Sequence, residues 1–121
     1  MGEAASILLV DDEPAILEST RLLLEEMGYK VTCLSDATRI VETLRALRPR
    51  ILLQDVRMPG LDLQALVKEI RADATIAATP VLLFSASMDL DELAERVGAP
   101  LSLEKPFRPR ELQDAIQSVL K

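Results

Sequence analysis

Four side chains that could do chemistry each follow a short apolar run of the sequence. They are Asp12, Asp55, Ser85 and Lys105. The runs, at residues 7–10, 51–53, 81–84 and 101–103, have the length and branched composition of buried strands. If these strands are parallel, their carboxyl ends lie at one edge of the sheet, where ligands of open α/β sheets bind. The spacing therefore predicts that the four side chains form one site.

The residue types at this predicted site favour a metal ion and phosphate chemistry. Asp11, Asp12 and Asp55 would repel one another if they were brought together, unless a cation neutralised the cluster. Magnesium suits such a cluster, because it prefers a few carboxylate or carbonyl oxygens and retains several waters. A carboxylate beside the metal can act as a nucleophile and form an aspartyl phosphate. Lys105 and Ser85 could then contact two phosphoryl oxygens, and the metal could contact the third.

What the sequence lacks narrows the chemistry further. It has no histidine and a single cysteine, Cys33, which excludes Ser-His and Cys-His nucleophilic pairs and an ordinary zinc site. Its net charge is −6 and its arginines are scattered, which argues against a direct nucleic-acid surface. No apolar stretch approaches the ~20 residues that are needed to cross a bilayer. We therefore expect a cytoplasmic protein that binds neither nucleic acid nor membranes directly.

Residues 30–34 are predicted to form a fifth strand. Helices must connect the five strands, and apolar stripes at helical spacing lie between the strands in the sequence. The first helix should begin at Pro14 and end before Gly28. The second should begin after Asp36, which can cap it, and stop before Pro49. The expected apolar faces are Ile16, Leu23 and Met27; Ala37, Ile40, Val41, Leu44 and Leu47; Leu63, Leu66, Val67 and Ile70; Leu90, Leu93, Ala94 and Val97; and Leu112, Ala115, Ile116 and Val119.

Strands that alternate with amphipathic helices predict the fold class. Five such pairs indicate an α/β protein with a five-stranded parallel sheet, helices on both faces and right-handed crossovers. A chain of 121 residues of which about half are apolar makes one compact domain, which we place at residues 1–121. No repeat, linker or low-complexity segment interrupts the pattern.

Four motifs, taken together, resemble the receiver domain of two-component response regulators over essentially the whole chain. The motifs are Leu9-Val10-Asp11-Asp12-Glu13, Asp55-Val56-Arg57-Met58-Pro59-Gly60-Leu61-Asp62, Phe84-Ser85-Ala86 and Lys105-Pro106-Phe107. Each motif follows its strand, and four motifs in this order are far more specific than any one of them. The resemblance is to stand-alone receivers of the chemotaxis-regulator type.

The resemblance implies a role for each residue of the predicted site. Asp55 would be the phosphorylated residue, and Ser85 and Lys105 would contact the phosphoryl group. Magnesium would be held by Asp11 through water, Asp12, Asp55 and the backbone carbonyl of Arg57. The family's sheet is flavodoxin-like, with strand order 2-1-3-4-5.

By the same resemblance, the leading hypothesis for function is a phosphorylation-driven switch. The chain would accept a phosphoryl group on Asp55 from a histidine kinase or a histidine phosphotransfer protein. It would signal through contacts with a downstream protein, as a monomer or weak dimer. It would catalyse its own phosphorylation and dephosphorylation, and so it is expected to be a signalling switch rather than an enzyme.

Other functions compete with this hypothesis. A phosphorylation-independent interaction module with the same fold is the main alternative, and Ser102 supports it, because the family usually has a switching aromatic there. The intact acidic pair and Asp55 speak against that alternative. A phosphatase with an aspartyl nucleophile would want a second acid two residues after Asp55, where Arg57 stands. Gln54 and Leu63 also depart from the family pattern, and Gln54 places an amide where an apolar residue is usual.

Single residues of the predicted site have structural alternatives as well. Asp12 could cap the first helix and favour the positive end of its dipole. Ser85 could be an ordinary turn residue and Lys105 a solvated surface charge. Asp62, which precedes a helical stripe, is expected to cap a helix and is left out of the site.

Overall fold

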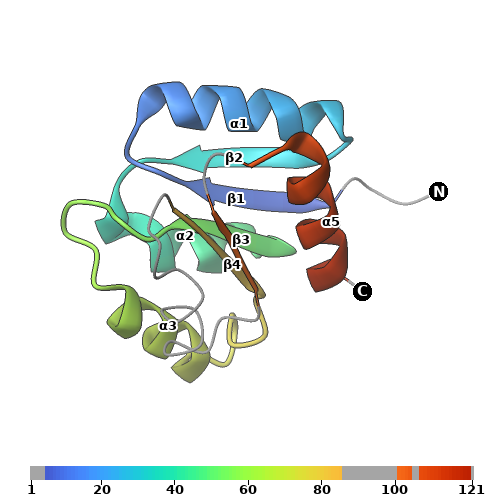
Figure 1. Ribbon diagram of the computed structural model, residues 1–121. Helices are drawn as coiled ribbons and strands as arrows, with labels where there is room; N and C mark the ends of the chain where they lie inside the picture. The colour runs from blue at the N-terminus through green and yellow to red at the C-terminus, as the bar shows by residue number, and fades with distance from the viewer. Residues whose placement is uncertain (1–4, 86–100, 105–106, 121) are drawn as a thin grey trace.

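The computed structural model describes residues 5–85, 101–104 and 107–120 of the chain. A five-stranded parallel sheet forms its centre, with strand order β2-β1-β3-β4-β5 (Figure 1). The strands are β1 (Ser6–Val10), β2 (Lys30–Leu34), β3 (Ile51–Asp55), β4 (Val81–Ser85) and β5 (Leu101–Glu104). The predicted fold class and strand order are therefore confirmed.

Helices lie on both faces of this sheet (Figure 1). The described elements are α1 (Pro14–Glu26), the 3-10 turn η1 (Ala37–Arg39), α2 (Ile40–Leu47), α3 (Leu63–Ala72) and α5 (Pro109–Leu120). Helices α1 and α5 share one core cluster with the sheet, and α2 and α3 share the other. The predicted helix with the stripe from Leu90 to Val97 lies outside the described residues. No helix in the described part of the chain is long and apolar enough to span a membrane.

The central strands are buried on both faces, which explains their continuous apolar sequences. On β1, Ile7 and Leu9 join the cluster with α1 and α5, whereas Leu8 and Val10 join the cluster with α2 and α3. All four side chains are at most 1% exposed. Each such side chain contributes about 1.5–3 kcal/mol when it is fully buried. Because the side chains along these strands pack into the two cores, the reactive side chains lie at the ends of the strands.

The buried face of α1 differs in part from the predicted stripe. Leu23 and Met27 pack against the core as predicted, but Ile16 belongs to neither core cluster. The buried residues of the helix are Thr20 and Leu24. Ile16 lies in the first turn, next to the polar edge of the sheet, and Thr20 was missed because a stripe of apolar residues does not count its methyl group.

The predicted apolar face of α2 needs one correction. Ile40 and Leu44 are fully buried, but Leu47 is 46% exposed. Leu47 is the last residue of α2, and the chain leaves the helix at Arg48, which has a left-handed φ of 46°. Pro49 follows and disfavours helical geometry in the residue before it. The stripe therefore ends one turn earlier than its spacing predicts.

An ion pair ties α2 to the turn that follows α3. Arg45 donates from Nε to Asp73, 28 residues later in the chain. The other carboxylate oxygen of Asp73 accepts hydrogen bonds from the hydroxyl and the backbone N–H of Thr75. These hydrogen bonds, that of the Thr75 hydroxyl first, favour the charged form and lower the pKa of Asp73 from 3.8 to about 2.

Candidate metal and phosphoryl site

Three carboxylates meet at the carboxyl edge of the sheet. Asp11 and Asp12 follow β1 and Asp55 is the last residue of the neighbouring strand β3. One oxygen from each carboxylate can be chosen so that all lie within 4.8 Å of one another. Asp11 is fully buried and Asp55 is 5% exposed, whereas Asp12 is half-buried. Parallel pairing of β1 with β3 thus brings together residues that are more than forty positions apart in the sequence.

The turn after β1 orients Asp11. Its backbone N–H donates to the carbonyl of Leu34 at the end of β2, with a donor–acceptor distance of 3.2 Å. Its Oδ1 accepts from the backbone N–H of Glu13 at 3.0 Å. This carboxylate therefore also helps to shape the turn that leads into α1.

Asp12 has no capping role in the structure. The residue at the amino-terminal cap of α1 is Glu13, and no side chain accepts a capping hydrogen bond there. Asp62, in contrast, accepts from the backbone N–H of Ala65 and caps α3, as its position in the sequence predicts. The structural alternative for Asp12 is thus not observed, and its carboxylate is available for a cation.

The loop between β3 and α3 forms one wall of this edge. The backbone N–H of Val56 donates to the carbonyl of Phe84 on β4 at 3.3 Å. Gly60 adopts a φ of 77°, a conformation that side-chain-bearing residues rarely adopt. Arg57 is exposed in this loop, two residues after Asp55.

Ser85 and Lys105 complete the predicted set in the sequence. Ser85 is the last residue of β4, and Phe84 beside it is the register partner of Asp55. The backbone of Ser85 therefore lies at the same edge of the sheet as the three aspartates. The side chain of Ser85 and the whole of Lys105 lie outside the described residues.

The ligand atoms present fit a hard divalent cation. Two buried carboxylates and a half-buried one, within 4.8 Å, concentrate negative charge where little water can screen it. Bringing three carboxylates this close is unfavourable because their negative charges repel one another, so a cation bound among them would be stabilising. An all-oxygen set with one open, half-buried side suits magnesium, which retains part of its water shell.

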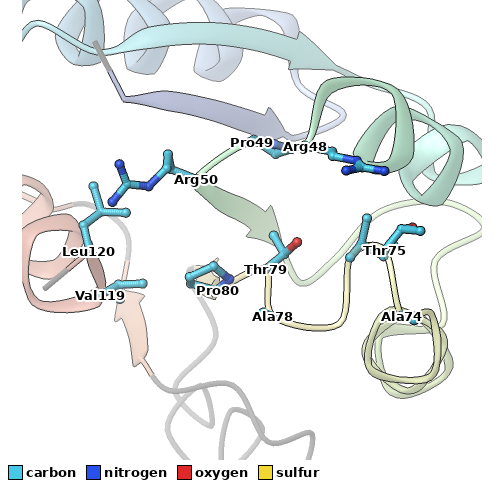
Figure 2. Close-up of a pocket in the computed structure, with 11 residues that line it drawn as sticks. Arg48, Pro49, Arg50, Ala74, Thr75, Ala78, Thr79, Pro80, Val119 and Leu120 are labelled. Carbon is cyan, nitrogen blue, oxygen red and sulfur yellow. The ribbon is translucent and has the colours of Figure 1, made fainter. Parts of the chain in front are cut away.

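One pocket among the described residues lies elsewhere. It has a volume of about 400 Å³ and is lined by the residues that precede β3 and β4 and by the end of α5. It therefore lies at the amino-terminal edge of the sheet, opposite the three aspartates. Figure 2 shows that the side chains of Arg48 and Arg50 extend away from each other at its rim. Because the two positive groups do not converge, the pocket is not the candidate site.

One polar residue beside the site was not expected to take part in it. Gln54 immediately precedes Asp55 and is fully buried in β3. The signal in the sequence was an amide at the end of an apolar run, Ile51-Leu52-Leu53. The sequence shows that Gln54 departs from the family pattern, but a sequence pattern does not give the direction of a side-chain amide.

Known proteins are similar to this chain in sequence. The model of the family described as response regulator receiver domain matches residues 7–117. The transcriptional regulatory protein CseB of Streptomyces avermitilis is 38% identical over 123 residues, which cover 100% of this chain and 51% of CseB. The chain spans about half the length of curated relatives that it matches.

Solved structures agree with the fold over nearly the whole chain. The chemotaxis response regulator CheY4 of Vibrio cholerae superposes with a TM-score of 0.86 at 28% identity, covering 97% of this chain and 99% of CheY4. The receiver domain of the sensor histidine kinase PA1611 of Pseudomonas aeruginosa superposes with a TM-score of 0.88 at 30% identity, covering 97% of this chain and 98% of that one. The PA1611 structure has a magnesium ion coordinated in its active site cleft.

Proposed function

Because this chain belongs to the response regulator receiver domain family, we propose that it accepts a phosphoryl group on Asp55 in a magnesium-dependent reaction and signals through protein contacts. The observation that carries the proposal is the cluster of Asp11, Asp12 and Asp55, whose carboxylate oxygens lie within 4.8 Å. Receiver domains are signalling switches, and the chain is proposed to modify itself rather than turn over other substrates.

In the proposed reaction, a carboxylate oxygen of Asp55 attacks the phosphorus of a phosphohistidine. The new O–P bond forms as the N–P bond breaks, and the leaving imidazole nitrogen keeps the electron pair and takes up a proton. When bound, magnesium neutralises negative charge on the phosphoryl oxygens. It would be held by Asp12 directly, by Asp11 through water, by Asp55 and by the backbone carbonyl of Arg57.

The remaining groups are proposed to position the phosphoryl group. The hydroxyl of Ser85 would donate a hydrogen bond to one phosphoryl oxygen and the ammonium of Lys105 would pair with another. Both assignments come from the family resemblance. The structure supports the first in one respect, since β4 ends at Ser85 beside the end of β3.

The proposed partners follow from this chemistry. A histidine kinase or a histidine phosphotransfer protein would supply the phosphoryl group, and a downstream protein would bind the altered surface. We propose that these contacts take place in the cytoplasm, that the chain is a monomer or weak dimer, and that it contacts neither nucleic acid nor membrane directly. CseB is a transcriptional regulator about twice as long, so a longer protein could connect the same switch to DNA.

A phosphorylation-independent interaction module remains the second candidate, and one observation favours it. Ser102 is half-buried on β5, next to Leu83 of β4 in the sheet register. By resemblance, an aromatic side chain at this position usually reports the state of the site. A serine has too little surface to report it by burial, so the output would need a different route or would be constitutive.

Intact-mass spectrometry tests the proposed function. The protein is incubated with magnesium and a small acyl phosphate donor, alongside the Asp55→Asn variant and a sample with chelator. We expect one phosphoryl adduct, which is lost in the variant and in the chelator sample. Asp62→Asn is the matched control, because it lies in the same loop, and asparagine can still cap α3. No adduct with the acyl phosphate or with a cognate kinase would favour the interaction module.

The lifetime of the adduct tests the role of Arg57. An exposed guanidinium two residues after Asp55 cannot act as a base for water. We expect slow to moderate hydrolysis in the native protein and a shorter lifetime in Arg57→Asn, because a smaller amide leaves room for water beside Asp55. An unchanged decay rate would remove Arg57 from this role.

A further inference from the structure

A buried amide touches the backbone of the proposed phosphoacceptor. Gln54 is 0% exposed and lies between Val10 of β1 and Leu83 of β4 in the sheet register. Both neighbours belong to the core cluster with α2 and α3. An apolar side chain would suit these surroundings better, because burying an amide is unfavourable unless its hydrogen bonds are made.

The amide nitrogen of Gln54 spans the first residues of the loop after β3. Its Nε2 donates to the backbone carbonyl of Asp55 at 2.9 Å and contacts Sδ of Met58 at 3.4 Å. An amide nitrogen carries two N–H groups, so both can be used. The two contacts lie at either end of the segment 55–58, which includes Arg57.

The peptide plane after Asp55 is thereby held at both ends. Its carbonyl accepts from Gln54, and its N–H, which belongs to Val56, donates to the carbonyl of Phe84 on β4. Rotation of this plane would break both hydrogen bonds. The direction in which the chain leaves Asp55 toward Arg57 is therefore determined by one side chain and one neighbouring strand.

The acceptor atom of the same amide is unsatisfied within the described part of the chain. Oε1 of Gln54 is buried and accepts no hydrogen bond from any residue in 5–85, 101–104 or 107–120. Turning the amide over would place this oxygen against the carbonyl of Asp55, so that two acceptors would face each other. The orientation is thus set by the donor side, and the folded protein tolerates an unsatisfied oxygen that an apolar residue would not have.

We propose that Gln54 is a positioning residue for the phosphoryl site: its amide holds the peptide plane after Asp55 so that the Asp55 carboxylate and the Arg57 carbonyl are placed for magnesium. This inference rests on the proposed function and specifies how its metal site is preorganised. It explains why a destabilising buried amide stands next to the reacting carboxylate. Gln54 itself touches neither the metal nor the phosphoryl group.

Gln54→Met removes both donors and the unsatisfied oxygen while keeping an unbranched side chain of similar size. Gln54→Leu is the second variant, because an apolar residue at this place is usual in the family. Leu52→Met is the matched control, since Leu52 is equally buried on the same face of β3. Three quantities are measured for each protein: the Tm without metal, the magnesium Kd by calorimetry, and the phosphorylation rate at limiting magnesium.

We expect the metal readouts to change while the Tm stays nearly constant. Without metal, both Gln54 variants should melt close to the native protein, because they remove the unsatisfied amide oxygen but also the donor to the Asp55 carbonyl. Their magnesium Kd should rise about fivefold, which corresponds to one typical hydrogen bond, and phosphorylation at limiting magnesium should slow by a similar factor. Leu52→Met should leave the Kd within twofold of the native value.

Two results would overturn the inference while leaving the proposed function intact. A magnesium Kd and phosphorylation rate within twofold of the native values would show that Gln54 positions nothing. A lower Tm with a proportionate loss of affinity, in Leu52→Met as well, would show a merely structural role. If the native protein itself binds no magnesium and forms no adduct, the proposed function fails and the inference fails with it, which the native sample alone reveals.

Discussion

Replacing Asp12 by asparagine should stabilise the metal-free protein and greatly weaken its stabilisation by magnesium. Asp12 is the most suitable of the three acids, because it is half-buried and makes no hydrogen bond to the other described residues. Helix α1 also has no side-chain cap that the change could remove. Asparagine keeps the shape of the side chain and removes one of three charges that lie within 4.8 Å. Unfolding separates these charges, so their repulsion destabilises the folded state.

The size of the effect follows from the geometry. At 4.8 Å two like charges repel by about 0.9 kcal/mol with the dielectric constant of water, and by about 3.5 kcal/mol at an effective value of about 20. Asp12 is in part exposed to solvent, so we use the value in water for each of its two pairs, which together give about 2 kcal/mol. For 121 residues this corresponds to a rise in Tm of roughly 7 °C.

The assay is thermal unfolding followed by circular dichroism at low ionic strength, first with chelator and then with magnesium. Asp114→Asn is the control, because this exposed acid on α5 changes the net charge equally without lying in the cluster. The native protein should gain about 2.7 kcal/mol when magnesium is present at about 100 times its Kd. The Asp12→Asn variant should gain much less at the same concentration.

Both the Tm without metal and the stabilisation by magnesium can contradict this prediction. If metal-free Asp12→Asn melts no higher than Asp114→Asn, the three carboxylates do not repel one another in the folded protein. If magnesium stabilises Asp12→Asn as much as the native protein, Asp12 is not a metal ligand. Salt provides a further check, because added salt at about 1 M shortens the Debye length to about 3 Å and should reduce the advantage of the variant.

Three further predictions concern stability away from the site. Leu44→Ala should destabilise the protein by about 2–5 kcal/mol because the side chain is fully buried, whereas Leu47→Ala, 46% exposed on the same helix, should change stability little in denaturant unfolding. Hydrogen bonds, above all that of the Thr75 hydroxyl, lower the pKa of Asp73 from 3.8 to about 2, so Asp73→Asn should lower the Tm at neutral pH. The difference in Tm between the native protein and the variant should disappear as the pH falls from about 4 to about 2, where the native carboxylate is protonated. An equal difference in Tm at neutral pH and at about pH 2 would contradict this prediction. Arg48→Gly should raise the Tm by a few degrees, because glycine adopts the left-handed φ of 46° without the strain of about 1–2 kcal/mol that arginine has there. The greater entropy of glycine in the unfolded chain offsets part of this gain. A lower Tm would show that the arginine side chain stabilises the fold by more than the strain destabilises it.

The location of the acidic cluster could be predicted from the sequence because it depends on short-range signals. Branched apolar runs mark the strands, and each reactive residue stands directly after its run. Parallel strands with helical connections share one carboxyl edge, so no knowledge of the packing was needed to bring Asp12 and Asp55 to the same place. The order of the strands, in contrast, came from the family resemblance, since periodicity does not say which strands are neighbours.

The helix faces were predictable only where a stripe stays over the sheet. The stripe of α3 is buried at Leu63, Leu66, Val67 and Ile70 as predicted, because all of it lies against the sheet. Leu47 and Ile16 were placed wrongly because each stands in the end turn of a helix. Periodicity gives the angle of a side chain around the helix axis but not whether anything packs on it there.

The sequence by itself determined the strands, the acids that end two of them and the family to which the chain belongs. The tertiary structure alone decided that three carboxylates lie within 4.8 Å, that Arg45 pairs with Asp73, and that the amide of Gln54 turns toward the carbonyl of Asp55. These are contacts between groups whose approach depends on strand register and side-chain rotamer. Such contacts depend on the packing of the whole fold, and no local pattern of residues encodes them.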